Sequence, residues 1–127
     1  MKKTIALNLI IRNYTDRSIF NLSLNGRGGE GASPYNSGTS VYADFTFDLG
    51  GPQTLTWTLD GPRGMARNGE VVTAKNPLYI REEDMPKGVR YLCIHIYPDE
   101  MAELTFTVGR PVPTARGAII LKETGNE

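Results

Sequence analysis

Hydrophobic and polar residues alternate with a period of two along most of this chain. The clearest example is residues 53–60, in which Leu55, Trp57 and Leu59 are separated by threonines. Successive side chains of a β-strand point to opposite faces, so this pattern predicts a half-buried strand with the three large residues facing the core. The same alternation is present in residues 5–11, 19–24 and 41–48.

Further short strands are predicted where apolar segments are bounded by residues that favour turns. Gly, Pro, Asn and Asp separate these segments, and each of these residues favours a turn for its own conformational reason. The segments are residues 70–74, 90–97, 103–108 and 118–122. About eight strands without a long amphipathic helix predict an all-β fold, for which we favour an antiparallel two-sheet β-sandwich over a closed barrel.

Two segments between the predicted strands, residues 26–39 and 61–68, are too long and too rich in glycine to be simple hairpins. Binding residues often lie on such loops, so we treat both as candidate functional loops. A helical turn is expected only in residues 80–85, because the acidic stretch 81–84 is a poor strand sequence and Pro86 ends any helix before it.

Length and composition restrict the class of protein. The 127 residues predict one domain, residues 1–127, with one hydrophobic core. Fourteen Lys and Arg balance fourteen Asp and Glu, so there is no overall positive field and we expect no nucleic-acid partner. The single cysteine, Cys93, cannot form an internal disulfide.

The first residues of the chain leave two compartments open. Lys2 and Lys3, followed by the apolar residues 5–11, resemble the start of a signal peptide, but Asn8 interrupts the run and no small-residue cleavage site follows. We therefore interpret this segment as a first strand and expect no membrane span. The protein is expected in the periplasm if a leader or lipoprotein signal has been removed, and in the cytoplasm otherwise.

Cys93 and His95 lie two residues apart on a predicted strand, so their side chains project from the same face. A thiol and an imidazole can form a nucleophile and base, but such neighbours are roughly 6 to 7 Å apart at Cα. A working pair needs hydrogen-bond reach and a third group that orients the base. Tyr91 and Tyr97 share this face, which is either covered by another segment or a recognition patch.

No other group of residues in the sequence predicts catalysis, a metal or a cofactor. One His and one Cys cannot complete a zinc site without distant carboxylates. The acidic residues 81–84 lack the alternating ligands of a calcium loop. The glycine-rich residues 25–31 lack the Lys-Ser/Thr ending of a phosphate-binding loop. We therefore expect a binding protein that is not an enzyme and carries no cofactor or metal.

One stretch of the chain resembles a known family. Residues 13–19 (Asn-Tyr-Thr-Asp-Arg-Ser-Ile), followed by Leu-Asn-Gly at 24–26, Gly-Gly at 28–29 and Pro-Tyr at 34–35, are similar to the opening of a family of small bacterial proteins. Many members are lipoproteins, and members are often encoded beside phospholipase effectors of the type VI secretion system. The similarity extends more loosely to Trp57 and residues 92–98, whereas Val41-Tyr42 stands near where the family usually has a Cys pair.

The resemblance implies an immunity protein that binds and neutralises a cognate effector, expected to be a lipase or phospholipase, by loop insertion or active-site blockage. The residues that we predict to bind this partner are chosen by residue type and loop position, since Arg, Tyr and Met are enriched at interfaces. They are Arg27, Glu30 and Tyr35 on the first candidate loop, and Arg63, Met65 and Arg67 on the second.

Two alternative functions remain open. One is a non-catalytic module that binds carbohydrate or lipid through the Tyr91 and Tyr97 face or through Trp57, although alternation with threonines predicts that Trp57 lies in the core. The other is a structural subunit of a larger assembly that pairs through an edge strand such as residues 5–11. The sequence predicts no particular oligomeric state.

Overall fold

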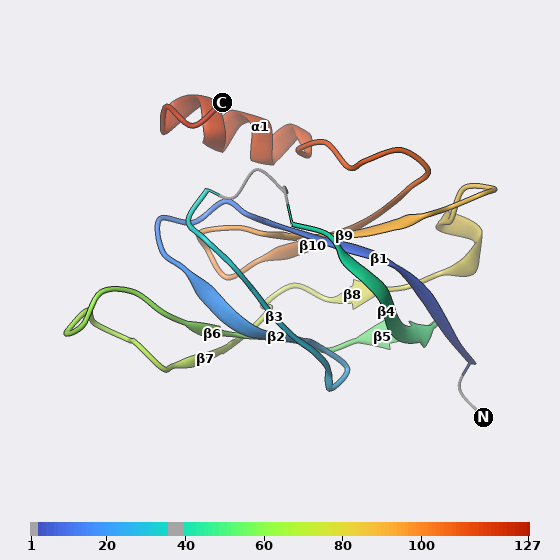
Figure 1. Cartoon of the computed structure of the whole chain (residues 1–127), viewed down its shortest axis with the longest axis horizontal. Helices are drawn as coiled ribbons and strands as arrows, with labels where there is room; N and C mark the ends of the chain where they lie inside the picture. Colours follow the sequence, from blue (N-terminus) through green and yellow to red (C-terminus); the bar gives the residue numbers. More distant parts are fainter. Residues whose placement is uncertain (1–2, 36–39) are drawn as a thin grey trace.

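The computed structural model describes residues 3–35 and 40–127, and it contains two four-stranded sheets packed against each other (Figure 1). The first sheet has the strand order β10-β9-β1-β4 and the second β3-β2-β6-β7, while β5 and β8 form a small two-stranded sheet. The strands are β1 (Lys3–Asn13), β2 (Ile19–Leu24), β3 (Arg27–Ala32), β4 (Tyr42–Leu49), β5 (Pro52–Gln53), β6 (Leu55–Leu59), β7 (Val71–Thr73), β8 (Leu78–Tyr79), β9 (Tyr91–Ile96) and β10 (Ala102–Thr107).

The predicted all-β sandwich is confirmed, with one difference in strand direction. β1 pairs with β9 in parallel, with Leu9 opposite Leu92, so the first sheet is mixed and not wholly antiparallel. The chain builds β2 to β8 between these two strands. A connection of that length can return in the original direction, which a short hairpin cannot do.

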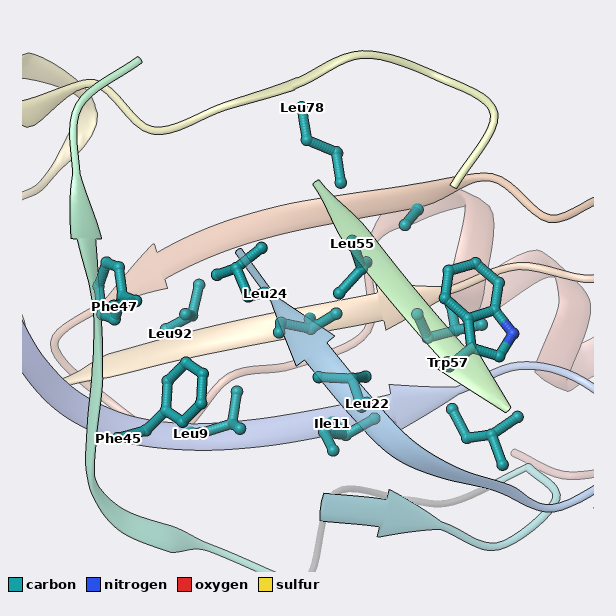
Figure 2. Close-up of a cluster of buried hydrophobic side chains, with 14 of the residues drawn as sticks. Leu9, Ile11, Leu22, Leu24, Phe45, Phe47, Leu55, Trp57, Leu78 and Leu92 are labelled. Carbon is teal, nitrogen blue, oxygen red and sulfur yellow. The ribbon is translucent and has the colours of Figure 1, made fainter. Parts of the chain in front are cut away.

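The main core lies between the two sheets. Figure 2 shows leucine, isoleucine and phenylalanine side chains from strands of both sheets meeting in this layer. Leu55, Trp57 and Leu59 of β6 are buried as the alternation predicts. Trp57 is 2% exposed and lies opposite Val72 of β7 in the second sheet.

The prediction that residues 5–11 form an edge strand is wrong, because the strand lies inside the first sheet. These residues lie in β1, which has β9 on one side and β4 on the other. β4 pairs with residues 3–9 and β9 with residues 8–13, so β1 lies inside the sheet and is not an edge strand along its length.

The first candidate loop is only partly a loop. Residues 27–32 form β3, which pairs with β2 in an antiparallel arrangement, and residues 36–39 lie outside the described residues. A Cβ atom at Gly28 would overlap the Leu22 carbonyl oxygen, and one at Gly31 would lie 2.7 Å from the Ile19 carbonyl oxygen. Glycine is therefore required here by close approach to β2, and its abundance does not mark a flexible loop.

The loop structure predicted for residues 61–68 and the predicted helical turn are confirmed. Residues 61–68 lie in the irregular connection between β6 and β7, and Glu82–Asp84 form a single turn of 3₁₀-helix, η1. No helix in the described part of the chain is long and apolar enough to cross a membrane.

The predicted strand at residues 118–122 is wrong, because these residues belong to the helix α1 (Ala115–Glu123). A short apolar run does not distinguish a strand from a helix by its periodicity. The helix is started by Thr114, whose side chain accepts a hydrogen bond from the Gly117 amide at 3.0 Å. It lies over the outer face of the first sheet (Figure 1) and buries Gly117 and Leu121.

Gly117 sits where the helix packs directly on Tyr14. A Cβ atom at Gly117 would overlap the Tyr14 ring, so Gly117→Ala is expected to lower the free energy of unfolding by about 1–3 kcal/mol through overpacking. This sign is opposite to the gain of roughly 1 kcal/mol that alanine gives in an open helix. Urea unfolding checks the prediction, with Gly109→Ala as a control in open space. A stabilised Gly117→Ala protein would contradict the packing of α1 on Tyr14.

Candidate functional site

Three connections between strands meet at one end of the sandwich. They are residues 14–18 between β1 and β2, residues 60–70 between β6 and β7, and residues 97–101 between β9 and β10. The Asp60 amide donates to the Ser18 carbonyl at 2.9 Å, and the Tyr14 amide donates to the Ile96 carbonyl at 2.9 Å. The 60–70 loop projects beyond the sheets at this end (left in Figure 1).

Asn13 shapes the first of these connections. Its side-chain oxygen accepts hydrogen bonds from the Thr15 amide at 3.1 Å and the Thr15 hydroxyl at 2.7 Å. Its amide nitrogen donates to the Arg17 carbonyl at 2.9 Å and the Ser33 carbonyl at 3.0 Å. Asn13 is fully buried, so these bonds satisfy a polar side chain and fix the turn that carries Arg17.

Arg17 braces the 60–70 loop from this turn. Its Nε donates to the Asp60 carbonyl at 2.9 Å and its Nη1 donates to the Ala66 carbonyl at 3.0 Å. Its Nη2 donates to Asn68 Oδ1 at 2.8 Å. The planar guanidinium thus holds the beginning and the end of the loop at once, which a single-point cation such as lysine cannot do.

Two further side chains cross-link the loop. Asn68 Nδ2 donates to the Pro62 carbonyl at 2.9 Å, across the loop. Arg67 donates to both carboxylate oxygens of Glu70, at 2.8 and 2.6 Å, and to Glu100 at 2.9 Å. The hydrogen bond from Arg67 holds the pKa of Glu70 below its ordinary value. These pairs are largely exposed, so they fix geometry more than they add stability.

A small pocket of about 220 Å³ lies between the three connections. Trp57 and Leu59 contribute to its wall although both are buried, and the other wall residues come from the surrounding turns. These other residues are Thr15, Asp16, Arg17, Arg67, Tyr97, Pro98 and Glu100. The pocket mixes apolar walls with charges of both signs, and its volume matches one side chain better than a drug-sized ligand.

The six predicted partner-binding residues do not form one surface. Arg63, Met65 and Arg67 lie on the 60–70 loop, and the Tyr35 amide donates to the Thr15 carbonyl at 3.1 Å beside it. Arg27 and Glu30 lie on β3 instead. Arg27 is at the opposite end of the second sheet, where its Nε lies 3.5 Å from Asp48 Oδ1.

Arg17, Asn68 and Glu100 are residues of this site that our sequence analysis did not select. Arg17 stands within the stretch 13–19, but only its neighbours Asn13, Thr15, Asp16 and Ile19 match the family pattern, so the sequence signals the turn and not Arg17 itself. Nothing in the sequence places Glu100 beside Arg67, because the two residues are joined only by the fold. Non-local pairs of this kind need the structure to be seen.

Cys93 and His95 are fully buried beneath the C-terminal residues, so the covered interpretation of this face is confirmed. Cys93 Sγ lies 4.0 Å from His95 Nδ1, which is also 2.8 Å from the Tyr14 hydroxyl. Burial raises the pKa of Cys93 to about 12 and lowers the pKa of His95 to about 4. A nucleophilic cysteine needs a lowered pKa, so this pair is not arranged for nucleophilic attack.

The described residues contain no cluster of potential metal ligands. Across residues 3–35 and 40–127, no three His, Cys, Asp or Glu side chains are grouped to hold a metal ion. Comparison with known proteins adds no further site, since no family model, curated protein or solved structure matches the chain. The braced 60–70 loop and the pocket beside it are therefore the candidate site.

Removing the brace is expected to loosen the loop. Arg17→Met keeps the apolar stem but removes three hydrogen bonds, which together are expected to cost about 1–2 kcal/mol of stability because the site is exposed. Backbone ¹⁵N relaxation should show faster and larger motion across residues 61–69. Arg81→Met, at an exposed position outside this end, is the matched control. Unchanged order parameters in the loop would contradict the bracing role.

Proposed function

We propose that this protein binds and inhibits another protein, and that it does so with the 60–70 loop. The observation that carries this proposal is a loop that is exposed to solvent yet internally cross-linked by Arg17, Asn68 and Arg67. Three separate side chains hold its backbone in one shape. The hydrogen bonds from Arg17, Asn68 and Arg67 hold this surface in the shape that a partner would bind.

Preorganisation of this kind strengthens binding without additional contacts. Ordering a flexible loop at an interface costs roughly 0.5–1.5 kcal/mol for each immobilised side chain. In this chain the backbone of the loop is already fixed before association. A convex, fixed loop fits the concave active-site cleft of an enzyme, where it blocks substrate without chemistry of its own.

The tip of the loop defines the kind of partner surface. Arg67 is neutralised by Glu70 and Glu100, whereas Arg63 makes no ion pair with any described residue. The Met65 side chain packs over Gly61 and is still 36% exposed. An unpaired cation next to a polarisable apolar side chain suits an acidic cleft with an apolar wall.

We propose further that the protein is an immunity protein and that its partner is a type VI secretion effector, a lipase or phospholipase. This part is supported by the resemblance of residues 13–19, within which Asn13 and Thr15 shape the turn and Arg17 holds the loop. Asn13 and Thr15, which match the family pattern, thus shape the turn from which Arg17 reaches the proposed binding loop. Periplasmic placement follows if a leader or lipoprotein signal precedes the domain.

The rival functions receive less support from the structure. Trp57 and Tyr97 are 2% and 3% exposed, so neither offers a stacking face to a carbohydrate or lipid, and Tyr91 is half-buried. β1 is an interior strand, so it is not the edge strand that we considered for assembly. No specific observation favours either alternative over inhibition of a protein.

The direct test of this function combines capture with an inhibition assay. The tagged chain is used to capture proteins from the bacterium that encodes it, and a captured hydrolase is then purified and assayed on phospholipid vesicles. Hydrolysis should fall towards zero at a one-to-one ratio of chain to enzyme. Full activity of the enzyme in the complex, or specific binding of a glycan or lipid in place of a protein, would contradict the proposal.

A further inference from the structure

The C-terminal segment, defined here as residues 109–123, lies across the outer face of β9 and β1 and contacts Arg12, Tyr14 and Tyr97 there. The Pro111 carbonyl accepts a hydrogen bond from Arg12 Nη2 at 2.9 Å, and Thr114 Oγ1 lies 2.6 Å from the Tyr97 hydroxyl. α1 has nine residues and buries only Gly117 and Leu121. A helix this short has little stability of its own, so its docking depends on these contacts.

The surface beneath this segment includes buried polar and charged groups among apolar residues, unlike the apolar core on the other side of the sheet. His95 is fully buried, with Nδ1 2.8 Å from the Tyr14 hydroxyl and Nε2 2.9 Å from Thr105 Oγ1. Arg12 is 9% exposed, and its Nε has no hydrogen-bond partner among the described residues. No described carboxylate forms an ion pair with Arg12, so its buried charge is uncompensated.

A stack of rings connects His95 to the helix. The His95 and Tyr14 rings are 5.8 Å apart and almost parallel, and Tyr14 stacks on Tyr97 at 5.4 Å. The Arg116 guanidinium lies 4.3 Å above the Tyr97 ring and pairs with Asp99 at 2.9 Å. Displacement of His95 or Tyr14 is therefore transmitted directly to residues that hold α1.

We propose that the C-terminal segment is an acid-released cover, which detaches when His95 is protonated beside Arg12 while the core of the sandwich stays folded. Both nitrogens of His95 are engaged with neutral groups, so the imidazolium would have no anionic partner in the closed form. Release of the segment admits water to both cations and relieves their repulsion. The uncovered surface would be cationic.

The groups around His95 support this direction of the effect. They are Cys93 and Tyr97 on β9, Arg12 and Tyr14 from β1 and its turn, Glu103 and Thr105 on β10, and Arg116 on the cover. Glu103 is the acid on this side, but it is exposed and its Oε1 accepts a hydrogen bond from the Tyr97 hydroxyl at 2.8 Å. The negative charge of Glu103 therefore stabilises a protonated His95 only weakly.

The pH range follows from the pKa of His95. Burial, and then the charge of Arg12, lower this pKa from its ordinary value of 6.5 to about 4 in the covered state. A base with a lowered pKa resists protonation while covered, so opening becomes more favourable as pH falls below 6.5 and saturates below pH 4. Between pH 7.5 and pH 5, the open fraction should rise by roughly 30-fold.

The single cysteine, Cys93, gives a direct measure of opening because it is buried on the covered face. We would follow its labelling by 4,4′-dithiodipyridine, which reacts in mildly acidic solution, and divide each rate by that of the urea-unfolded chain at the same pH. The normalised rate should rise about 30-fold from pH 7.5 to pH 5. In His95→Gln, which cannot be protonated, it should change less than threefold.

Two controls separate release of the cover from other effects. Trp57 is the single tryptophan and lies in the core, so its fluorescence should stay constant across this pH range. Thr114→Val removes the helix cap and should raise labelling by about fivefold at both pH values without changing their ratio. A pH-independent rate in the native chain, a 30-fold rise retained in His95→Gln, or a parallel change in Trp57 fluorescence would overturn the proposal.

Discussion

A chain that carries both Arg63→Glu and Met65→Ala is expected to bind its partner at least a hundredfold more weakly than the native chain. Residues at the centre of an interface often contribute 2 kcal/mol or more each, and two such losses exceed a factor of about 100. Reversal of the Arg63 charge adds repulsion from an acidic partner surface. Isothermal titration calorimetry with the purified partner measures the change.

The loss must come from the interface and not from unfolding. Arg63 forms no ion pair with a described residue, and Met65 is exposed at the surface, so the melting temperature should shift by no more than about 2 °C. A matched double variant, Lys87→Glu with Tyr79→Ala, changes an exposed cation and an exposed apolar residue outside the site. If the control variant weakened partner binding as much as the Arg63 and Met65 variant, the binding surface would lie outside the 60–70 loop.

Trp57→Ala is expected to lower the free energy of unfolding by about 3–5 kcal/mol, the largest change that we predict for any single substitution. The indole is 2% exposed and packs within the main core, opposite Val72 of the neighbouring strand (Figure 2). Its removal leaves a cavity that the surrounding residues fill only in part. This cost is a large fraction of the 5–15 kcal/mol typical of a domain.

Urea unfolding followed by circular dichroism measures this effect, since the variant has lost its only tryptophan. Phe20→Ala is the control, because Phe20 is 38% exposed and should cost less than about 1 kcal/mol. The experiment also separates two functions. If Trp57 were the platform of a carbohydrate or lipid module, the substitution would remove ligand binding and leave stability nearly unchanged.

The faces of several strands follow from the sequence because the period of two is a direct consequence of strand geometry. Leu55, Trp57 and Leu59 are buried as that period predicts. The period does not report strand direction, so it could not predict that β1 pairs with β9 in parallel. It also does not distinguish a short buried helix from a strand, which is why α1 was predicted as a strand.

The composition of a segment was a weaker guide than its alternation. Glycines at 28 and 31 predicted a loop, but they are required where β3 passes close to the backbone of β2. The 60–70 loop was found by the same criterion and is a real loop. Residue type alone therefore selected Arg63 on this loop and Arg27 at the other end of the sheet.

The supporting residues of the candidate site were hidden because their contacts are non-local. Arg17 reaches the loop across 43 to 51 positions of sequence, and Arg67 meets Glu100 across 33. For the same reason the sequence could not decide whether the Cys93 and His95 face is covered. The helix that covers this face, α1, is predicted from the sequence as a strand, and the sequence does not show which strand or face it packs against.

The central claim is that the braced 60–70 loop is the surface that binds the partner. Hydrogen–deuterium exchange of the native chain, with and without its purified partner, tests this claim most directly. We predict that complex formation slows exchange at residues 61–69 and in the adjacent turns 14–18 and 97–101, with little change in β5 and β8. Protection centred on β3 or on the surface of α1, with the loop unchanged, would contradict the account.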